Sequence, residues 1–188
     1  MISYAQNFED VILWRAFKGV DKGTYLDIGA HDPVVDSVSK AFYDAGWRGV
    51  NVEPEPQAAE KLRQARPDDT VLEFAVDTKP QKLAFYQFAG TGLSTGLKEL
   101  ADKHEENGRS AEKISVKTKT LSAIFNQMNS DEIHWMKVDV EGMEKSVLSS
   151  WGNATARPWV VLVESTLPNS VETAEISWEK ELLSRGYS

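Results

Sequence analysis

Short apolar runs alternate with amphipathic segments over the first 76 residues of the chain. Apolar side chains that recur at three- and four-residue steps predict helices, and apolar runs closed by glycine, proline or polar residues predict buried parallel strands. Short connections between such elements favour right-handed crossovers and a doubly wound α/β fold. The expected strands are 24–28, 49–53 and 70–76. Helices are expected at 5–17 and 57–65, and a further helix, capped by Asp36 or Ser37, is expected to end at Gly46.

The pattern changes between residues 80 and 119, where 82–88 and 113–117 alternate apolar and polar positions. Such alternation predicts half-exposed strands, so we expect an antiparallel insertion. It contains a loop at 90–96 with three glycines, which is either a lid or an ordinary hairpin connection. The α/β rhythm then returns, with expected strands at 133–138 and 159–163 and expected helices at 97–107, 121–128, 143–151 and 171–185.

Length and composition describe one globular domain of 188 residues, with its N-terminal helix inside residues 1–18. The formal net charge of -8 disfavours nucleic acid and anionic lipid as partners. The chain has no cysteine, which excludes disulfides, thiolate zinc sites and cysteine nucleophiles. The N-terminus lacks a signal-peptide pattern, and we find no apolar stretch long enough for a transmembrane segment, so we expect a cytoplasmic protein.

An acidic residue lies at or directly after the end of each of the five expected parallel strands. In an open parallel sheet, ligands bind beyond the carboxyl ends of the strands, so these residues are the first candidates for a site. Any one of them alone is as well explained by helix capping or solvation. The acidic strand ends are Asp27, Glu53, Asp77, Asp139 with Glu141, and Glu164.

The loop after the first strand indicates the class of ligand. A diphosphate site needs the pattern Gly-x-Gly-x-x-Gly, of which this loop has only Gly29, and Asp27 would repel a diphosphate. A cationic cofactor such as S-adenosylmethionine is favoured instead. Glu53 is then placed to accept hydrogen bonds from the ribose hydroxyls, and Val76 with Asp77 to read the adenine edge. A nicotinamide-dependent, NAD(P)-binding enzyme is the alternative from a different class.

Five motifs together resemble the FkbM family of S-adenosylmethionine-dependent methyltransferases. In chain order they are YAQNFED at 4–10, YLDIGAHDP at 25–33, VEP at 52–54, KVDVEG at 137–142 and VEST at 163–166. The resemblance covers essentially the whole chain. It implies a Rossmann-like class I fold with methyl transfer to a hydroxyl oxygen, commonly of a sugar, a glycan or a glycosylated metabolite.

The resemblance also implies roles for individual residues. Asp27, Gly29, Ala30 and His31 match the cofactor loop of the family, and Glu53 matches the ribose contact. Asp139, Glu141 and Gly142 match the end of the active-site strand, where Asp139 is also a candidate for cofactor binding. Gln6 and Asp10 of the opening motif are candidates for substrate binding.

Methyl transfer to a hydroxyl requires that the acceptor lose a proton, and four residues are candidates for the base: His31, Asp139, Glu141 and Glu164. Asp139 and Glu141 are two apart in an extended segment, so their side chains point the same way. We favour Glu141 as the base, with Asp139 orienting substrate or cofactor. The alternatives are that Asp139 caps the next helix, that Glu141 bonds only backbone, and that His31 holds backbone beside the cofactor.

The glycine loop adds Ser94 and Thr95, whose hydroxyls are candidates for hydrogen bonds to a sugar acceptor. The carboxylates can also hold Mg²⁺ or Ca²⁺, but nothing in their spacing requires a divalent metal, and we expect none. The segment 159–163 is apolar at every position, and the sixth and seventh strands of the family fold do not follow it. We therefore expect self-association through its edge, or low stability. The third hypothesis for the function is a cofactor-binding or assembly module without enzymatic activity.

Overall fold

The computed structural model describes residues 2–128, 132–165 and 178–188. The chain divides into two compact units, and each is described by itself. Unit 1 contains Met1–Glu73, Met128–Lys137 and Thr155–Leu162, and unit 2 contains Phe74–Gln127, Val138–Ala154 and Val163–Ser188.

A five-stranded sheet in the order β3-β2-β1-β7-β8 forms the centre of unit 1. The pairs β1–β2 and β2–β3 are parallel. Because β1 lies in the middle and the chain builds outward from it in both directions, the strand order reverses beside β1. The predicted doubly wound α/β fold is confirmed. The strands are β1 (Thr24–Ile28), β2 (Arg48–Val52), β3 (Thr70–Leu72), β7 (Trp135–Val138) and β8 (Val160–Val163).

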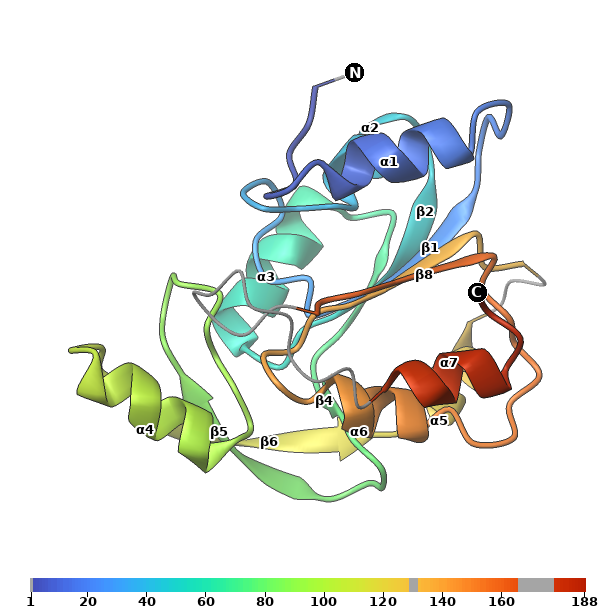
Figure 1. Cartoon of the computed structure of the whole chain (residues 1–188). Coiled ribbons are helices and arrows are strands. Elements are labelled where there is room, and N and C mark those ends of the chain that lie inside the picture. The colour runs from blue at the N-terminus through green and yellow to red at the C-terminus, as the bar shows by residue number, and fades with distance from the viewer. Residues whose placement is uncertain (1, 129–131, 166–177) are drawn as a thin grey trace. The chain divides into compact units, whose positions relative to one another are not determined.

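The helices of unit 1 are α1 (Glu9–Ala16), α2 (Lys40–Asp44) and α3 (Pro56–Ala65). Figure 1 shows α1 and α2 on the same side of β1 and β2. Side chains from both helices meet residues of β1 and β7 in an aromatic-rich core, and these residues are Leu13, Phe17, Tyr25, Val38, Phe42, Trp47 and Trp135.

Two helices begin later than their sequence patterns predict. Helix α1 was expected from residue 5, but Phe8 has a left-handed backbone with φ of 63°, so the helix begins at Glu9. Helix α2 was expected from Asp36 or Ser37. Asp36 is left-handed with φ of 53°, and the Ser37 hydroxyl is bonded to a buried arginine, so the helix begins only at Lys40.

Unit 2 contains a three-stranded sheet in the order β4-β6-β5, made of β4 (Ala75–Val76), β5 (Lys82–Gln87) and β6 (Glu112–Lys119). Strands β5 and β6 are antiparallel, which confirms the predicted insertion. Its helices are α4 (Lys98–Glu106), α5 (Leu121–Gln127), α6 (Glu144–Ser149) and α7 (Glu179–Ser184).

The predicted strand at 70–76 is wrong as a single element. Residues 70–72 form β3 in the five-stranded sheet, whereas Ala75 and Val76 pair with Thr118 and Lys119 of β6. Between the two strands, Phe74 is buried, and the Lys119 ammonium lies 4.8 Å from the centre of its ring. The apolar run is therefore continuous in sequence but divided between two sheets.

Strand β8 lies at the edge of the five-stranded sheet in the part of the chain that is described, and all four of its residues are half-buried. The expected self-association through this edge stays a prediction. Of the predicted helix at 171–185, residues 171–177 lie outside the described residues, and α7 forms the rest. Within the described ranges, no helix has both the length and the apolar character needed to cross a membrane.

Asp69 ties three strand-associated groups of unit 1 together. Its carboxylate accepts hydrogen bonds from the Tyr25 hydroxyl at 2.5 Å, the Gly49 amide at 2.8 Å and the Asn51 side chain at 2.9 Å. Burial and the neighbouring Asp69 charge raise the pKa of the Tyr25 hydroxyl, so Tyr25 stays a donor. The adjacent Asp68 instead pairs with Arg48 at 2.8 Å in an exposed ion pair.

Substitution of these adjacent aspartates should separate the two kinds of contact. Asp69→Ala leaves the buried Tyr25 hydroxyl without its acceptor and should lower the free energy of unfolding by about 2–4 kcal/mol. Asp68→Ala removes only an exposed pair, worth less than about 1 kcal/mol. Urea unfolding of both variants measures the difference, and equal losses would contradict the structural role of Asp69.

Candidate active site

The loop that follows β1, residues 29–32, is here called the Gly29 loop. The amides of Gly29 and Ala30 both donate to the carbonyl of Val52 in β2, at 2.9 and 3.3 Å. Gly29 has φ of 81° and His31 has φ of 46°. The left-handed backbone of His31 turns the loop back across the ends of β1 and β2, where the sequence analysis expected a ligand.

Glu53 directly follows β2, and its carboxylate holds the Gly29 loop through a hydrogen bond. One carboxylate oxygen accepts the His31 amide and the other accepts the Glu55 amide, both at 2.8 Å. Burial raises the pKa of Glu53 to about 7 in spite of these two bonds, because only 4% of the residue is exposed. Each carboxylate oxygen can accept a second hydrogen bond, so Glu53 can hold the loop and still accept a ligand hydroxyl.

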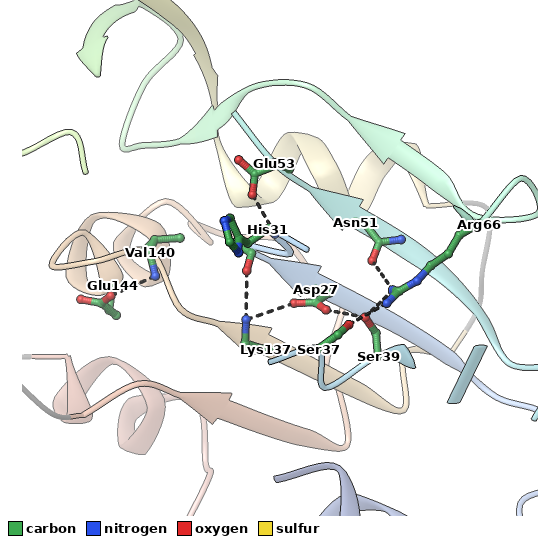
Figure 2. A network of polar contacts seen from close by, with 11 residues as sticks. Asp27, His31, Ser37, Ser39, Asn51, Glu53, Arg66, Lys137, Val140 and Glu144 are labelled. Atoms are coloured by element: carbon green, nitrogen blue, oxygen red, sulfur yellow. Dashed lines mark hydrogen bonds and ion pairs between the residues drawn. The ribbon is translucent and has the colours of Figure 1, made fainter. Parts of the chain in front are cut away.

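Asp27, the one acidic residue of β1, is buried, and its carboxylate contacts two partners (Figure 2). The Ser39 hydroxyl donates to its Oδ2 at 2.6 Å, and the Lys137 ammonium lies 3.4 Å from its Oδ1. That Lys137 ammonium also donates to the carbonyl of Gly29 at 3.0 Å. Asp27 is therefore linked to the Gly29 loop through Lys137.

Sequence reasoning gave no role to Lys137, although it is the one charged residue within β7. A lysine within an otherwise apolar strand needs a buried partner, and this pattern could have identified Lys137 from the sequence. Arg66, also missed, is 1% exposed and binds the segment that follows the Gly29 loop (Figure 2). No comparable signal marked Arg66, because it follows a helix whose other charged residues are exposed.

In unit 2, Asp139, Glu141 and Glu164 form a carboxylate cluster in which one oxygen of each residue lies within 4.8 Å of the others. Asp139 directly follows β7 and Glu164 directly follows β8, and the Glu164 amide donates to the Val138 carbonyl at 3.0 Å. Glu141 has a left-handed backbone with φ of 49°. The cluster could hold a divalent cation, but the expectation of no metal stays untested.

Burial, the charge of Asp139 and a hydrogen bond to Asp139 raise the pKa of Glu164 to about 9. Glu164 is therefore protonated at neutral pH and donates to the Asp139 carboxylate. The nearby charges of Glu141 and Glu144 act in the same direction. The cluster thus holds one proton at neutral pH, which reduces the repulsion among its carboxylates.

Glu144 shapes the turn that carries Asp139 and Glu141. Its Oε1 accepts the amides of Val140 at 3.1 Å and Gly142 at 3.2 Å, and α6 begins at Glu144. Sequence reasoning offered Asp139 or Glu141 for such backbone contacts and overlooked Glu144. A glutamate that opens a helix directly after an acidic strand end was the signal that could have found it.

Thr95 also supports this turn. It is fully buried, and its hydroxyl donates to the Glu141 carbonyl at 2.8 Å while it accepts the Leu97 amide at 3.0 Å. The Ser94 hydroxyl accepts the Phe88 amide at 2.9 Å. Both hydroxyls expected to bind a sugar thus have partners within the protein, and their contact with a substrate stays a prediction.

Four further candidate residues remain: Val76, Asp77, Asp10 and Gln6. The Asp77 carboxylate accepts the Thr78 amide and the Gln81 side-chain amide, both at 2.7 Å, and Val76 ends β4 in the small sheet. Asp10 is buried and accepts hydrogen bonds from Ser3, Tyr4 and Ala5. Gln6 is exposed. Their proposed contacts with cofactor or substrate stay predictions.

The comparison with protein families matches residues 27–188 to the methyltransferase FkbM domain. The chain therefore belongs to the FkbM methyltransferase family, and the resemblance read from its motifs is confirmed. Comparison with curated proteins and with solved structures gave no match. The match begins at Asp27 and includes Glu53, Asp139, Glu141 and Glu164, so both groups of acidic residues lie inside the family domain.

The proton held by Glu164 should make stability depend on pH. Its folded pKa of about 9 lies above the ordinary value of 4.5, so its contribution to stability is complete below pH 4.5 and is lost as pH rises through 9. Thermal unfolding between pH 7.5 and 9 lies above the pKa of Glu53 and isolates this group.

Over this range the melting temperature of the wild type should fall more steeply than that of Glu164→Gln, which cannot ionise. Glu99→Gln, in the exposed first turn of α4, is the matched control and should keep the wild-type slope. Parallel slopes for wild type and Glu164→Gln would show that Glu164 does not hold the proton.

Proposed function

We propose that the protein is an S-adenosylmethionine-dependent O-methyltransferase that acts on a hydroxyl of a sugar, a glycan or a glycosylated metabolite. Membership of the FkbM methyltransferase family supports the reaction class. The observation that carries the cofactor assignment is the contact between the buried Glu53 carboxylate and the His31 amide of the Gly29 loop. It brings an acidic residue after the second strand beside a glycine loop after the first, and in nucleotide-binding α/β folds an acidic residue at this place binds the ribose.

The residues of unit 1 fit this cofactor. Asp27 Oδ1 is buried and accepts no hydrogen bond from the described residues, although Lys137 lies near it. Glu53 keeps acceptor capacity for two ribose hydroxyls after its bonds to His31 and Glu55. The cofactor carries a sulfonium and an ammonium, and carboxylates stabilise both. The Gly29 loop lacks the further glycines that an NAD(P) diphosphate needs, which disfavours the nicotinamide alternative.

When bound, S-adenosylmethionine supplies an electrophilic methyl group. The protein must orient the acceptor hydroxyl and accept its proton. We assign the proton to Glu141 because Glu164 is already protonated at neutral pH and shares its hydrogen with Asp139. Asp139 then orients the acceptor through its carboxylate. Carboxylates accept hydrogen bonds from hydroxyls, so this cluster suits a polyhydroxyl acceptor.

Cofactor binding provides the first test. Glu53→Gln removes the charge and replaces one acceptor by a donor, and each charge-assisted hydrogen bond is worth about 1.5–3 kcal/mol, so affinity for S-adenosylmethionine should fall at least about tenfold. Wild-type affinity should rise between pH 6 and 8 as Glu53 ionises through its pKa of about 7, and Glu53→Gln should lose that dependence. Isothermal titration calorimetry measures both.

Glu60→Gln, on the exposed face of α3, is the matched control and should bind as the wild type does. Equal affinities of wild type and Glu53→Gln at every pH would overturn the ribose assignment. Binding of NAD(H) in place of S-adenosylmethionine would favour the nicotinamide enzyme. Tight binding of S-adenosylmethionine without methyl transfer to any hydroxyl acceptor would favour the inactive module.

The catalytic assignment predicts a separation of turnover from binding. Because Glu141 takes a proton only during reaction, Glu141→Gln should lower kcat about 10²–10⁴-fold, the usual contribution of general base catalysis. Its affinity for S-adenosylmethionine should stay within about twofold of wild type, since an interaction made during reaction does not alter cofactor binding. Transfer of a radiolabelled methyl group to a sugar acceptor measures turnover.

The control for this experiment is Glu112→Gln, an exposed residue of β6. Loss of cofactor binding by a folded Glu141→Gln protein would contradict the assignment of Glu141 as the base. Activity that EDTA abolishes and Mg²⁺ restores would assign the carboxylate cluster to a metal and overturn the role of Glu141 as the base.

A further inference from the structure

Arg66 is a fully buried cation in unit 1, directly after α3, with 1% of the residue exposed. Its guanidinium donates four hydrogen bonds. Nη1 binds the Ser39 hydroxyl at 2.5 Å and the Asn51 side-chain oxygen at 3.1 Å. Nη2 binds the Pro33 carbonyl at 2.8 Å and the Ser37 hydroxyl at 2.6 Å. All four acceptors are neutral.

Three of these acceptors belong to residues 33–39, here called the Pro33 segment, which connects the Gly29 loop to α2. One planar group therefore fixes the start, the middle and the end of that segment. Asp36 within it has a left-handed backbone, so the segment is not held by helical hydrogen bonds before α2 begins. Three sets of contacts hold the Pro33 segment instead. The Ser37 amide donates to the Tyr4 carbonyl at 3.0 Å, and the Asp32 carboxylate accepts the Val34 and Val35 amides, both at 2.9 Å. Arg66 adds three hydrogen bonds, spread over the length of the segment.

Arg66 is linked to two carboxylates through one side chain each: to Asp69 through Asn51, and to Asp27 through Ser39. Ser39 accepts from Arg66 and donates its own proton to Asp27 at 2.6 Å. Asp27 is paired with Lys137, which holds the Gly29 carbonyl at 3.0 Å. A continuous series of polar contacts therefore runs from Arg66 to the Gly29 loop (Figure 2).

We propose that Arg66 is a positioning residue for cofactor binding: by fixing the Pro33 segment and the Ser39–Asp27 contact, it holds the Gly29 loop in the conformation that accepts S-adenosylmethionine. This inference rests on the proposed function of unit 1. Arg66 itself touches no cofactor in this account. Without it, part of the binding energy would be spent on ordering residues 29–39, and the affinity would fall accordingly.

Lysine cannot replace Arg66 in this role. The four hydrogen bonds diverge from a planar fork of nitrogens, whereas an ammonium offers three donors from a single atom. Arg66→Lys keeps the buried positive charge and loses the geometry. The matched control is Arg63→Lys on the same helix, because Arg63 is exposed and pairs with Glu73 and Glu60 at the surface.

The experiment measures two quantities on each variant: the Kd for S-adenosylmethionine by calorimetry, and amide hydrogen exchange of the protein without cofactor. Arg66→Lys should raise Kd at least about tenfold. Exchange should become faster at Val34, Val35 and Ser37, while amides of β1 and β2 stay protected. Arg63→Lys should leave both quantities unchanged. A general loss of stability would instead speed exchange in the strands as well.

Ser37→Ala provides a second route if Arg66→Lys does not fold. It removes one acceptor of Arg66 without touching Asp27, and should raise Kd about three- to tenfold. In the double variant Arg66→Lys/Ser37→Ala, Kd should be no higher than in Arg66→Lys, since both changes act on one contact. Additive losses would contradict a shared pathway.

Wild-type Kd in folded Arg66→Lys or in Ser37→Ala, with unchanged exchange in the Pro33 segment, would overturn the inference. Failure of the wild type to bind S-adenosylmethionine would contradict the proposed function instead. Exchange would then still decide the role of Arg66: unchanged protection at Ser37 in Arg66→Lys would overturn it, and selective loss there would support it.

Discussion

The buried ion pair between Asp27 of β1 and Lys137 of β7 is the interaction on which the Gly29 loop of unit 1 depends. Its charged atoms lie 3.4 Å apart, and the two side chains are 1% and 9% exposed. Burial of two charges costs several kcal/mol for each ion, and mutual attraction offsets this only when further hydrogen bonds are present. Those bonds come from Ser39 to Asp27 and from Lys137 to the Gly29 carbonyl. A displaced loop would leave both charges poorly solvated, so the cost of charge burial enforces the order of the loop.

Further buried charges of unit 1 lie near this ion pair. Arg66 and Lys137 are the cations of the network, and Asp27 and Glu53 are its acids (Figure 2). Burial raises the pKa of Glu53 to about 7 although Lys137 and two amides act to lower it. Glu53 therefore ionises near neutral pH, and its ionisation adds one negative charge to this buried network.

The strands of the five-stranded sheet could be predicted from the sequence, because apolar runs indicate buried strands and acidic residues mark the strand ends. Asp27, Glu53, Asp139 and Glu164 were selected on that basis. The burial of Arg66 could not be predicted from the sequence, because its four partners lie 15 to 33 residues away and form no pattern that indicates a buried guanidinium. The apolar run at 70–76 gave no sign that its two halves pair with different sheets, since periodicity reports burial and not the pairing partner. The start of α2 was missed because the left-handed backbone of Asp36 is a consequence of tertiary contacts.

The acidic residues of this chain differ in the partners that surround them. Asp10, Asp69 and Asp77 each accept two or more hydrogen bonds from amides or from side-chain donors. These contacts hold neighbouring backbone and side chains in place. In the carboxylate cluster of unit 2, the neighbours that dominate the titration of Glu164 are other carboxylates. Burial adds to this repulsion, and a proton on Glu164 relieves part of it, so Glu164, like the buried Glu53, keeps its proton to a higher pH than an ordinary glutamate does.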